Sequence, residues 1–277
     1  MFYLILATLC FSISFGLIKE QLSILPSEFV VVCRLFIAFL VFLPFLRKIN
    51  CKKALVAISI GAVQFGIMYL CFIKAFKYLQ GNEVALLTTT TPIFVGIISS
   101  LLGEKFKPVY ILCILMSVFG AVLILWHSIP LVWIVKGIVL MECSNASFAL
   151  GQVLWKKYIN DNDLKIIPLA YLGALIITIP IMLFNVDADS ITLSKLQILS
   201  LIYLGTVPTG IGFWLWNKGA KSVKYSLLAI MNNLKIPISI LVAIFIFKEE
   251  VNIFYYVLGL IFIITSILII LRDAKIK

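Results

Sequence analysis

The sequence predicts an all-α membrane protein with ten transmembrane helices, arranged as two inverted five-helix repeats around a central cavity. Of the 277 residues, 63% are hydrophobic and 13% are charged, whereas about a quarter of the residues in soluble domains are charged. The apolar residues gather into runs that can cross a bilayer, which takes about 20 residues per helix. The second half of the chain also repeats polar and proline positions of the first half.

Each apolar run is separated from the next by a short connection with charged residues. The first five runs are 2–19, 28–46, 54–74, 83–102 and 108–126, and the second five are 131–155, 165–184, 196–216, 225–247 and 252–271. A membrane β-barrel would require short alternating runs, which this sequence does not show. Helices satisfy their backbone groups internally, so each run is predicted to be a helix.

Lys and Arg are concentrated in the even-numbered connections, as in Arg47 to Lys53, and in the C-terminal tail. Cytoplasmic loops of membrane proteins carry the excess of these residues. We therefore expect an integral membrane protein with both termini in the cytoplasm and Asp187 and Asp189 outside. The bias toward Lys, Ile and Asn with only three Arg is typical of an AT-rich genome and indicates a bacterium, so the expected location is the bacterial cytoplasmic (inner) membrane.

The two halves of the chain resemble each other at fixed offsets. A shift of 145 positions aligns Pro92 with Pro237 and Glu104 with Glu249, and a shift of 133 aligns Cys10 with Cys143. This predicts two repeats, residues 1–126 and 127–277. Because five is odd, the second repeat must cross the membrane in the opposite sense, as in many secondary transporters.

Several short motifs occur in the order typical of a known family. They are Arg34-Leu35-Phe36, Ala75 with Tyr78, Pro92, Gly103-Glu104 and Gly120. In this pattern the chain resembles the EamA-type members of the drug/metabolite transporter superfamily. The resemblance implies a ten-helix inner-membrane carrier of small metabolites, often amino acids or related compounds, and commonly an exporter or exchanger.

Ten polar residues fall near the middle of their predicted helices, where a polar side chain is costly unless it faces protein or water. We therefore take them as candidate substrate-binding residues. They are Ser12, Gln64, Thr88, Thr91, Glu142, Asn145, Thr209, Asn232, Asn233 and Lys235.

Two of the helices carry their polar cluster directly before a proline, Pro92 or Pro237. Proline frees a carbonyl one turn earlier, and such a broken backbone is tolerated at membrane depth when it lines a cavity. Interrupted segments at corresponding positions of two halves point to a transport site. The alternative is that the prolines only kink the helices while Thr hydroxyls bond to their own turn.

Two charged residues have open alternatives. Glu142 could bind a substrate ammonium, could carry a coupling proton, or could form a static ion pair with Lys235. Arg34, about two turns inside the outer end of its helix, could attract an anionic group at an outer vestibule or could extend its side chain to the interface.

The leading hypothesis is a secondary carrier, an exporter or exchanger working by alternating access, for zwitterionic or anionic metabolites, with amino acids first. Uptake of a charged metabolite such as S-adenosylmethionine, or export of organic cations, is the alternative carrier function. An intramembrane enzyme or a receptor is the alternative of a different class, but the sequence has no catalytic set, phosphate loop or metal-site pattern. We expect no cofactor and no nucleic acid. The expected partners are the substrate, the bilayer and a proton or exchange substrate, for a monomer or weak dimer.

Overall fold

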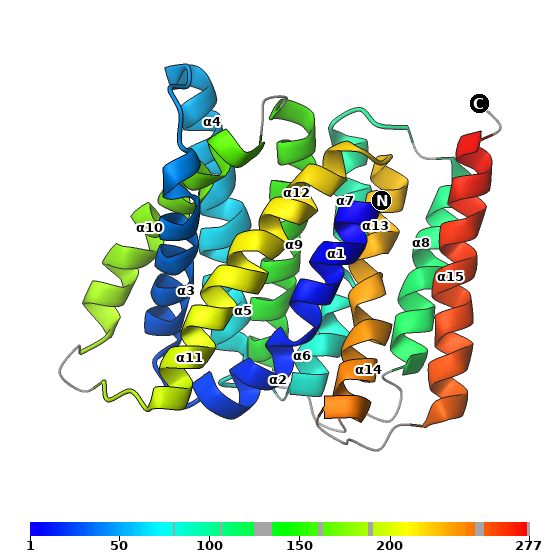
Figure 1. The fold of residues 1–277 in the computed structure, drawn as a ribbon. Helices are drawn as coiled ribbons and strands as arrows, with labels where there is room; N and C mark the ends of the chain where they lie inside the picture. The colour runs from blue at the N-terminus through cyan, green and yellow to red at the C-terminus, as the bar shows by residue number, and fades with distance from the viewer. Residues whose placement is uncertain are drawn as a thin grey trace.

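The computed structural model describes residues 1–79, 81–105, 107–124, 135–159, 163–187, 191–246 and 252–275. Over these residues the chain is helical, and its helices stand side by side as a bundle (Figure 1). Each predicted run corresponds to one crossing of this bundle, either a continuous helix or a helix with an interruption. The predicted all-helical membrane fold is confirmed.

The first five crossings belong to the first half of the chain. They are α1 (Phe2–Ser12), α2 (Ser14–Leu17) and η1 (Ile18–Leu22); α3 (Ser27–Phe42) and η2 (Leu43–Phe45); α4 (Cys51–Gly61), η3 (Ala62–Ile67) and α5 (Met68–Ala75); α6 (Gly81–Thr88) and α7 (Thr91–Leu101); and α8 (Pro108–Ile124).

The second five crossings follow in the same order. They are α9 (Val135–Tyr158); α10 (Asp163–Asn185); α11 (Lys195–Leu204), η6 (Gly205–Gly212) and α12 (Phe213–Lys221); α13 (Tyr225–Met231), η7 (Asn232–Leu234) and α14 (Lys235–Ile246); and α15 (Ile253–Lys275). In the described ranges, seven helical segments are long and apolar enough to span a bilayer, and α1 and α8 are shorter apolar helices.

The N-terminus and the C-terminal end of α15 lie at one end of the bundle, the end that also carries the connection from η2 to α4 (Figure 1). We call it the terminal end, and the other the distal end. Asp187 follows α10 at the distal end, while Asp189 lies outside the described residues. The positions of these connections agree with the predicted alternation.

The fourth and ninth crossings are interrupted before their prolines. A turn at Thr89 and Thr90 separates α6 from α7, and the 3-10 turn η7 separates α13 from α14. Pro92 has no N–H to offer the carbonyl of Thr88. The hydroxyl of Thr91 donates to that carbonyl instead, at 2.8 Å, so the broken turn keeps a hydrogen bond.

The eighth crossing contains the π-helix η6, with Pro208 inside it. A Cβ at Gly205 would lie 2.7 Å from the Cβ of Ile37, so α3 can approach closely only because this residue is glycine. The hydroxyl of Tyr171 donates to the carbonyls of Thr209, at 2.6 Å, and Gly210, at 3.0 Å. Gly205 therefore allows close packing against α3, and the π-helix around Pro208 presents carbonyls that Tyr171 can bind.

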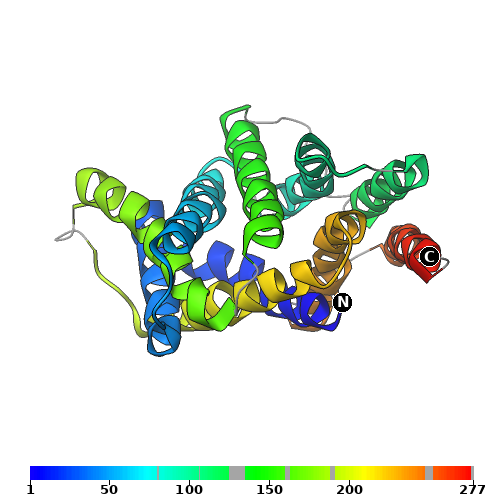
Figure 2. The ribbon, with the colours of Figure 1, turned by 90° about the horizontal axis from the view of Figure 1, so that it is seen from above.

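Seen from above, α8 and α15 stand at one end of an elongated outline and α10 stands at the other (Figure 2). The paired helices run in opposite directions and meet at Gly120 and Gly259. A Cβ at Gly120 would lie 2.6 Å from the carbonyl oxygen of Gly259, and a Cβ at Gly259 would lie 2.2 Å from that of Gly120. The two backbones are thus in direct contact, away from the centre of the bundle.

Candidate substrate-binding site

Arg34 on α3 is a buried cation at the centre of three crossings, with 1% of its surface exposed. Its Nε donates to the hydroxyl of Thr209 at 3.1 Å, and its Nη2 donates to the hydroxyl of Tyr69 at 2.9 Å. Its Cζ also lies 4.5 Å from the centroid of the Tyr69 ring. These partners are uncharged, and no carboxylate among the described residues forms an ion pair with the guanidinium.

The third nitrogen of this guanidinium, Nη1, has no hydrogen-bond partner. Removing a charge from water without a counter-charge costs free energy of several kcal/mol or more. The guanidinium would therefore be stabilised by a ligand that brings a hydrogen-bond acceptor into the cavity beside Nη1. Arg34 lies about two turns inside the distal end of α3, and its buried side chain lines the central cavity instead of extending to the interface.

This cavity has a few polar residues set among apolar ones. Its apolar and aromatic lining includes Phe11, Met68, Phe72, Phe148, Pro208 and Phe213. The polar lining comprises Arg34 and Tyr69, the hydroxyls of Ser14, Thr88, Thr91 and Ser144, and the side chains of Asn145 and Lys235. Small-molecule sites in proteins usually combine an apolar wall with a few placed polar groups. The centres of water molecules can occupy about 80 Å³ of the space, so this conformation holds a narrow cavity.

Lys235 supplies a second cation to the same cavity. It begins α14, directly after the η7 interruption, and its side chain is partly buried. Glu142 is not its partner: the Glu142 carboxylate accepts a hydrogen bond from Thr90 at 2.9 Å instead. The static ion pair between Glu142 and Lys235 is therefore not formed in this structure, and Glu142 lies beside the cavity rather than on its lining.

Asn145 connects the cavity with the interrupted fourth crossing. Its amide nitrogen donates to the carbonyl of Leu87, at 2.8 Å, and lies 3.0 Å from the hydroxyl of Thr90. The hydroxyl of Thr91 lies 3.2 Å from its amide oxygen. The bonding of Thr hydroxyls to their own turn, which the sequence left as an alternative, also occurs, because Thr88 donates to the carbonyl of Ala85.

Besides Glu142, five other predicted residues do not line the cavity. Thr209 holds Arg34, and Ser12 donates only to the carbonyl of Thr8 in its own helix. The other three bond to side chains of neighbouring helices: Gln64 with Asn217 at 2.8 Å, Asn232 with Gln152 at 3.4 Å, and Asn233 with Ser117 at 3.2 Å.

The amide pairs and the cavity lie in different halves of the bundle. Asn217 lies four residues before the end of α12 and Gln152 six residues before the end of α9, which at 1.5 Å per residue places both within about 10 Å of the terminal end. Arg34 lies seven residues after the start of α3, in the distal half. The cavity is therefore in the distal half, and packed amide pairs occupy the terminal half.

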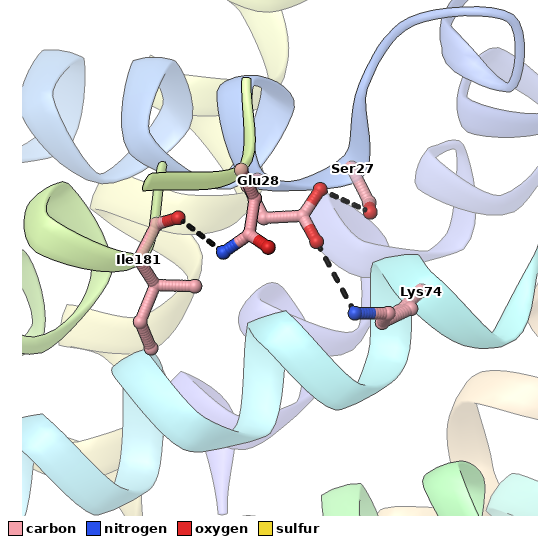
Figure 3. A network of polar contacts seen from close by, with 5 residues as sticks. Ser27, Glu28, Lys74 and Ile181 are labelled. Atoms are coloured by element: carbon pink, nitrogen blue, oxygen red, sulfur yellow. Dashed lines mark hydrogen bonds and ion pairs between the residues drawn. The ribbon is translucent and has the colours of Figure 1, made fainter. Parts of the chain in front are cut away.

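At the distal end, an ion pair joins α3 to α5 beyond the cavity. The Nζ of Lys74 lies 3.3 Å from the Oε1 of Glu28, and the hydroxyl of Ser27 donates to the other carboxylate oxygen at 2.8 Å (Figure 3). Lys74 is about two-fifths exposed, so this pair contributes little to stability by itself. It holds the ends of two helices whose next turns carry Arg34 and Tyr69.

Sequence reasoning missed Tyr69 and Tyr171, which position Arg34 and the carbonyls of η6. A tyrosine within an apolar run resembles any other aromatic residue of a hydrophobic core. Only one property could have indicated a polar role in advance: the hydroxyl of a buried tyrosine usually needs a hydrogen-bond partner.

Comparison with known proteins identifies the family. The EamA-like transporter family matches residues 1–126 and 135–272. The chain belongs to this family of drug/metabolite transporters, and it is a transporter rather than an enzyme.

Relatives align over most of the chain. A protein of Pseudomonas aeruginosa named as a probable biotin transporter is 32% identical over 273 residues, which cover 96% of this chain and 95% of that protein. The biotin transporter of Escherichia coli K12 is 31% identical over 272 residues, covering 95% of this chain and 90% of that protein. A solved crystal structure at 16% identity superposes with a TM-score of 0.79 over 96% of this chain and 94% of that one, which supports the fold alone.

Proposed function

We propose that this protein carries a small carboxylate-bearing metabolite across the bacterial cytoplasmic membrane, and that biotin is its substrate. The observation that carries the proposal is the buried guanidinium of Arg34, which lines the cavity, has only uncharged partners and keeps one nitrogen without a partner. The names of the related proteins supply biotin as the compound to test.

Charge in the cavity favours an anion over the other solutes considered. Arg34 and Lys235 line it, and no carboxylate does so among the described residues. A zwitterionic amino acid or an organic cation would bring an ammonium or another positive group that finds no counter-charge there. Amino acids, the first substrate class expected from the sequence, are also not named for the relatives compared above.

The parts of biotin match the parts of the lining. A carboxylate can accept charge-assisted hydrogen bonds from a guanidinium, which are among the strong ones in proteins. The ring system carries an uncharged ureido group, which can exchange hydrogen bonds with Thr88, Thr91 or Asn145, and an apolar face that suits Phe148 and Phe213. The cavity must widen to admit the whole molecule.

The distribution of basic residues supports an orientation with the terminal end in the cytoplasm. In that orientation the cavity lies in the outer half, and the amide pairs close the path to the cytoplasm. Alternating access then requires these pairs to separate while the distal half closes. The chain has no nucleotide-binding motif, so transport proceeds downhill, by exchange, or by coupling to an ion gradient.

Counterflow in proteoliposomes that contain only this chain tests the proposal. Vesicles loaded with unlabelled biotin should accumulate external radiolabelled biotin, and biotin should compete whereas biotinamide, which lacks the carboxylate charge, should not. Labelled alanine in the same vesicles is the control for the amino-acid alternative. Counterflow of alanine without counterflow of biotin would contradict the proposal, and equal competition by biotinamide would remove the role of the carboxylate.

A further inference from the structure

A second cavity, of about 710 Å³, opens at the terminal end between the ends of α7, α9 and α12 and the start of α13. Five lysines line it. Lys105 and Lys107 come from the connection between α7 and α8, Lys156 from α9, Lys221 from α12, and Lys224 from the connection between α12 and α13. Glu104 is the one acidic residue on the described part of its lining. The transport cycle proposed above assigns no role to this cavity, which we call the lysine pocket.

Only part of the positive charge is compensated within the protein. Asp273 lies beside the pocket and accepts hydrogen bonds from Lys107, with Nζ at 2.6 Å from Oδ1 and 2.9 Å from Oδ2, and from the hydroxyl of Tyr110. The ammonium of Lys156 lies 4.8 Å from the centroid of the Tyr225 ring. Even without Lys221, four lysines (Lys105, Lys107, Lys156 and Lys224) against the two carboxylates of Glu104 and Asp273 leave two positive charges around this cavity.

A buried hydroxyl also lines the lysine pocket. Ser226 on α13 is 3% exposed, and its Oγ has no hydrogen-bond partner. Buried polar atoms in native proteins nearly always have a partner, and those without one call for an explanation such as a bound group. Like the ammonium groups, this hydroxyl can donate a hydrogen bond to an anion held in the pocket.

We propose that the lysine pocket binds a phosphate group, carried either by an anionic phospholipid of the adjoining leaflet or by a soluble phosphate compound. A phosphate monoester carries about 1.5 to 2 negative charges and three acceptor oxygens, which suits two excess charges better than a single carboxylate does. Basic pockets between helices at the cytoplasmic surface are a known setting for phospholipid headgroups. The bound phosphate would join the ends of α7, α9 and α13, next to the amide pairs.

Thermal unfolding of the purified full-length chain in detergent tests this, because a ligand that binds the folded state raises the melting temperature. One arm compares inorganic phosphate with chloride at equal ionic strength. The other compares dioctanoyl phosphatidic acid with dioctanoyl phosphatidylcholine. Each arm uses wild type, K156Q/K224Q, S226A, and the control K48Q/K52Q. The control removes the same charge at the same end, from the η2 to α4 connection and the first turn of α4.

The melting temperatures of wild type and K48Q/K52Q should be higher with inorganic phosphate than with chloride, or higher with phosphatidic acid than with phosphatidylcholine. K156Q/K224Q should bind the stabilising probe about tenfold more weakly or worse, since hydrogen bonds between charged groups are the strong ones. S226A, which removes one hydroxyl and so tests the pocket without a charge change, should show a smaller loss. A response to inorganic phosphate without one to phosphatidic acid identifies a soluble source, and a response to phosphatidic acid, alone or at lower concentration than to inorganic phosphate, identifies a headgroup. Equal responses of wild type, K156Q/K224Q and S226A, or no response of wild type in either arm, would overturn the proposal.

Discussion

Thr209, in the second half of the chain, accepts a hydrogen bond at 3.1 Å from the Nε of Arg34, which precedes it by 175 positions. The hydroxyl of Tyr69 lies 3.0 Å from that of Thr209 and accepts from Arg34 at 2.9 Å, which closes a triangle of polar contacts. The triangle fixes the direction of the guanidinium without neutralising it. The positive charge of Arg34 is therefore available to a ligand.

Arg34→Lys should reduce biotin transport by about tenfold or more, because an ammonium cannot reproduce the bonds of a planar guanidinium to a carboxylate while also holding Tyr69 and Thr209. The initial rate of counterflow at several biotin concentrations measures the effect. Ser12→Ala is the matched control, since the Ser12 hydroxyl bonds only within its own helix. Unchanged transport by the Arg34→Lys protein would contradict a role of the guanidinium in binding.

Gln64→Leu should lower the free energy of unfolding by about 1 to 3 kcal/mol, because the buried amide of Asn217 loses its partner. Melting temperatures in detergent measure the loss. The double variant Gln64→Leu/Asn217→Leu removes both polar groups and should recover part of the stability. If the two single losses simply add in the double variant, the amides are not coupled.

Glu142→Gln should preserve the fold, because an amide oxygen can still accept the hydrogen bond from Thr90. If Glu142 carries the coupling proton, biotin counterflow should continue while acceleration by an imposed pH gradient disappears. Glu28→Gln is the control: it removes a carboxylate at the distal end of the same bundle (Figure 3) and should leave the gradient response intact. An unaltered gradient response in Glu142→Gln would exclude this residue from coupling.

Gly120→Ala should destabilise the protein by about 1 to 3 kcal/mol, the usual cost of adding atoms to a packed site. The new Cβ would lie 2.6 Å from the carbonyl oxygen of Gly259, a backbone atom that cannot turn aside. Gly96→Ala is the matched control, because its Cβ would meet only the end of the Ile114 side chain at 3.4 Å. Equal melting temperatures for the two variants would show that the α8 and α15 contact is looser than described.

Cysteines placed at Lys53 and Asp187 in a Cys-free background should react with a membrane-impermeant thiol reagent from opposite sides. The reason is that these positions lie at the terminal and distal ends of the bundle. Labelling of intact cells should reach the residue at 187 and not the one at 53 if the terminal end is cytoplasmic. Labelling of both from one side would contradict the arrangement in Figure 1.

The fold could be predicted because its signals are local. Apolar run length sets each crossing, and Pro92 and Pro237 mark the two interruptions, as the turn at Thr89 and Thr90 and the turn η7 show. Counting along a helix also gives the depth of a side chain. Eight of the ten predicted substrate-binding residues are buried within the bundle, and Glu142 and Lys235 are partly buried.

The direction in which each side chain points could not be predicted, since it depends on which neighbouring helix lies opposite. Lys235 and Thr91 face the cavity, whereas Asn233 bonds to Ser117 on α8. The irregular turn η7 changes the angular spacing of residues around its helix, so a regular helical projection fails there. The burial of the Arg34 side chain could not be predicted either, because its partners, Tyr69 and Thr209, come from other crossings.

The contact between Gly120 and Gly259 joins the fifth crossing of each half, and the two helices run in opposite directions. Two copies of a single five-helix chain, inserted in opposite orientations, would meet through one such glycine from each copy, across a two-fold axis in the membrane plane. In the present chain the corresponding contact is made within one molecule, so it forms without a second copy. Each half can then carry its own polar residues, as Arg34 in the first half and Lys235 in the second illustrate.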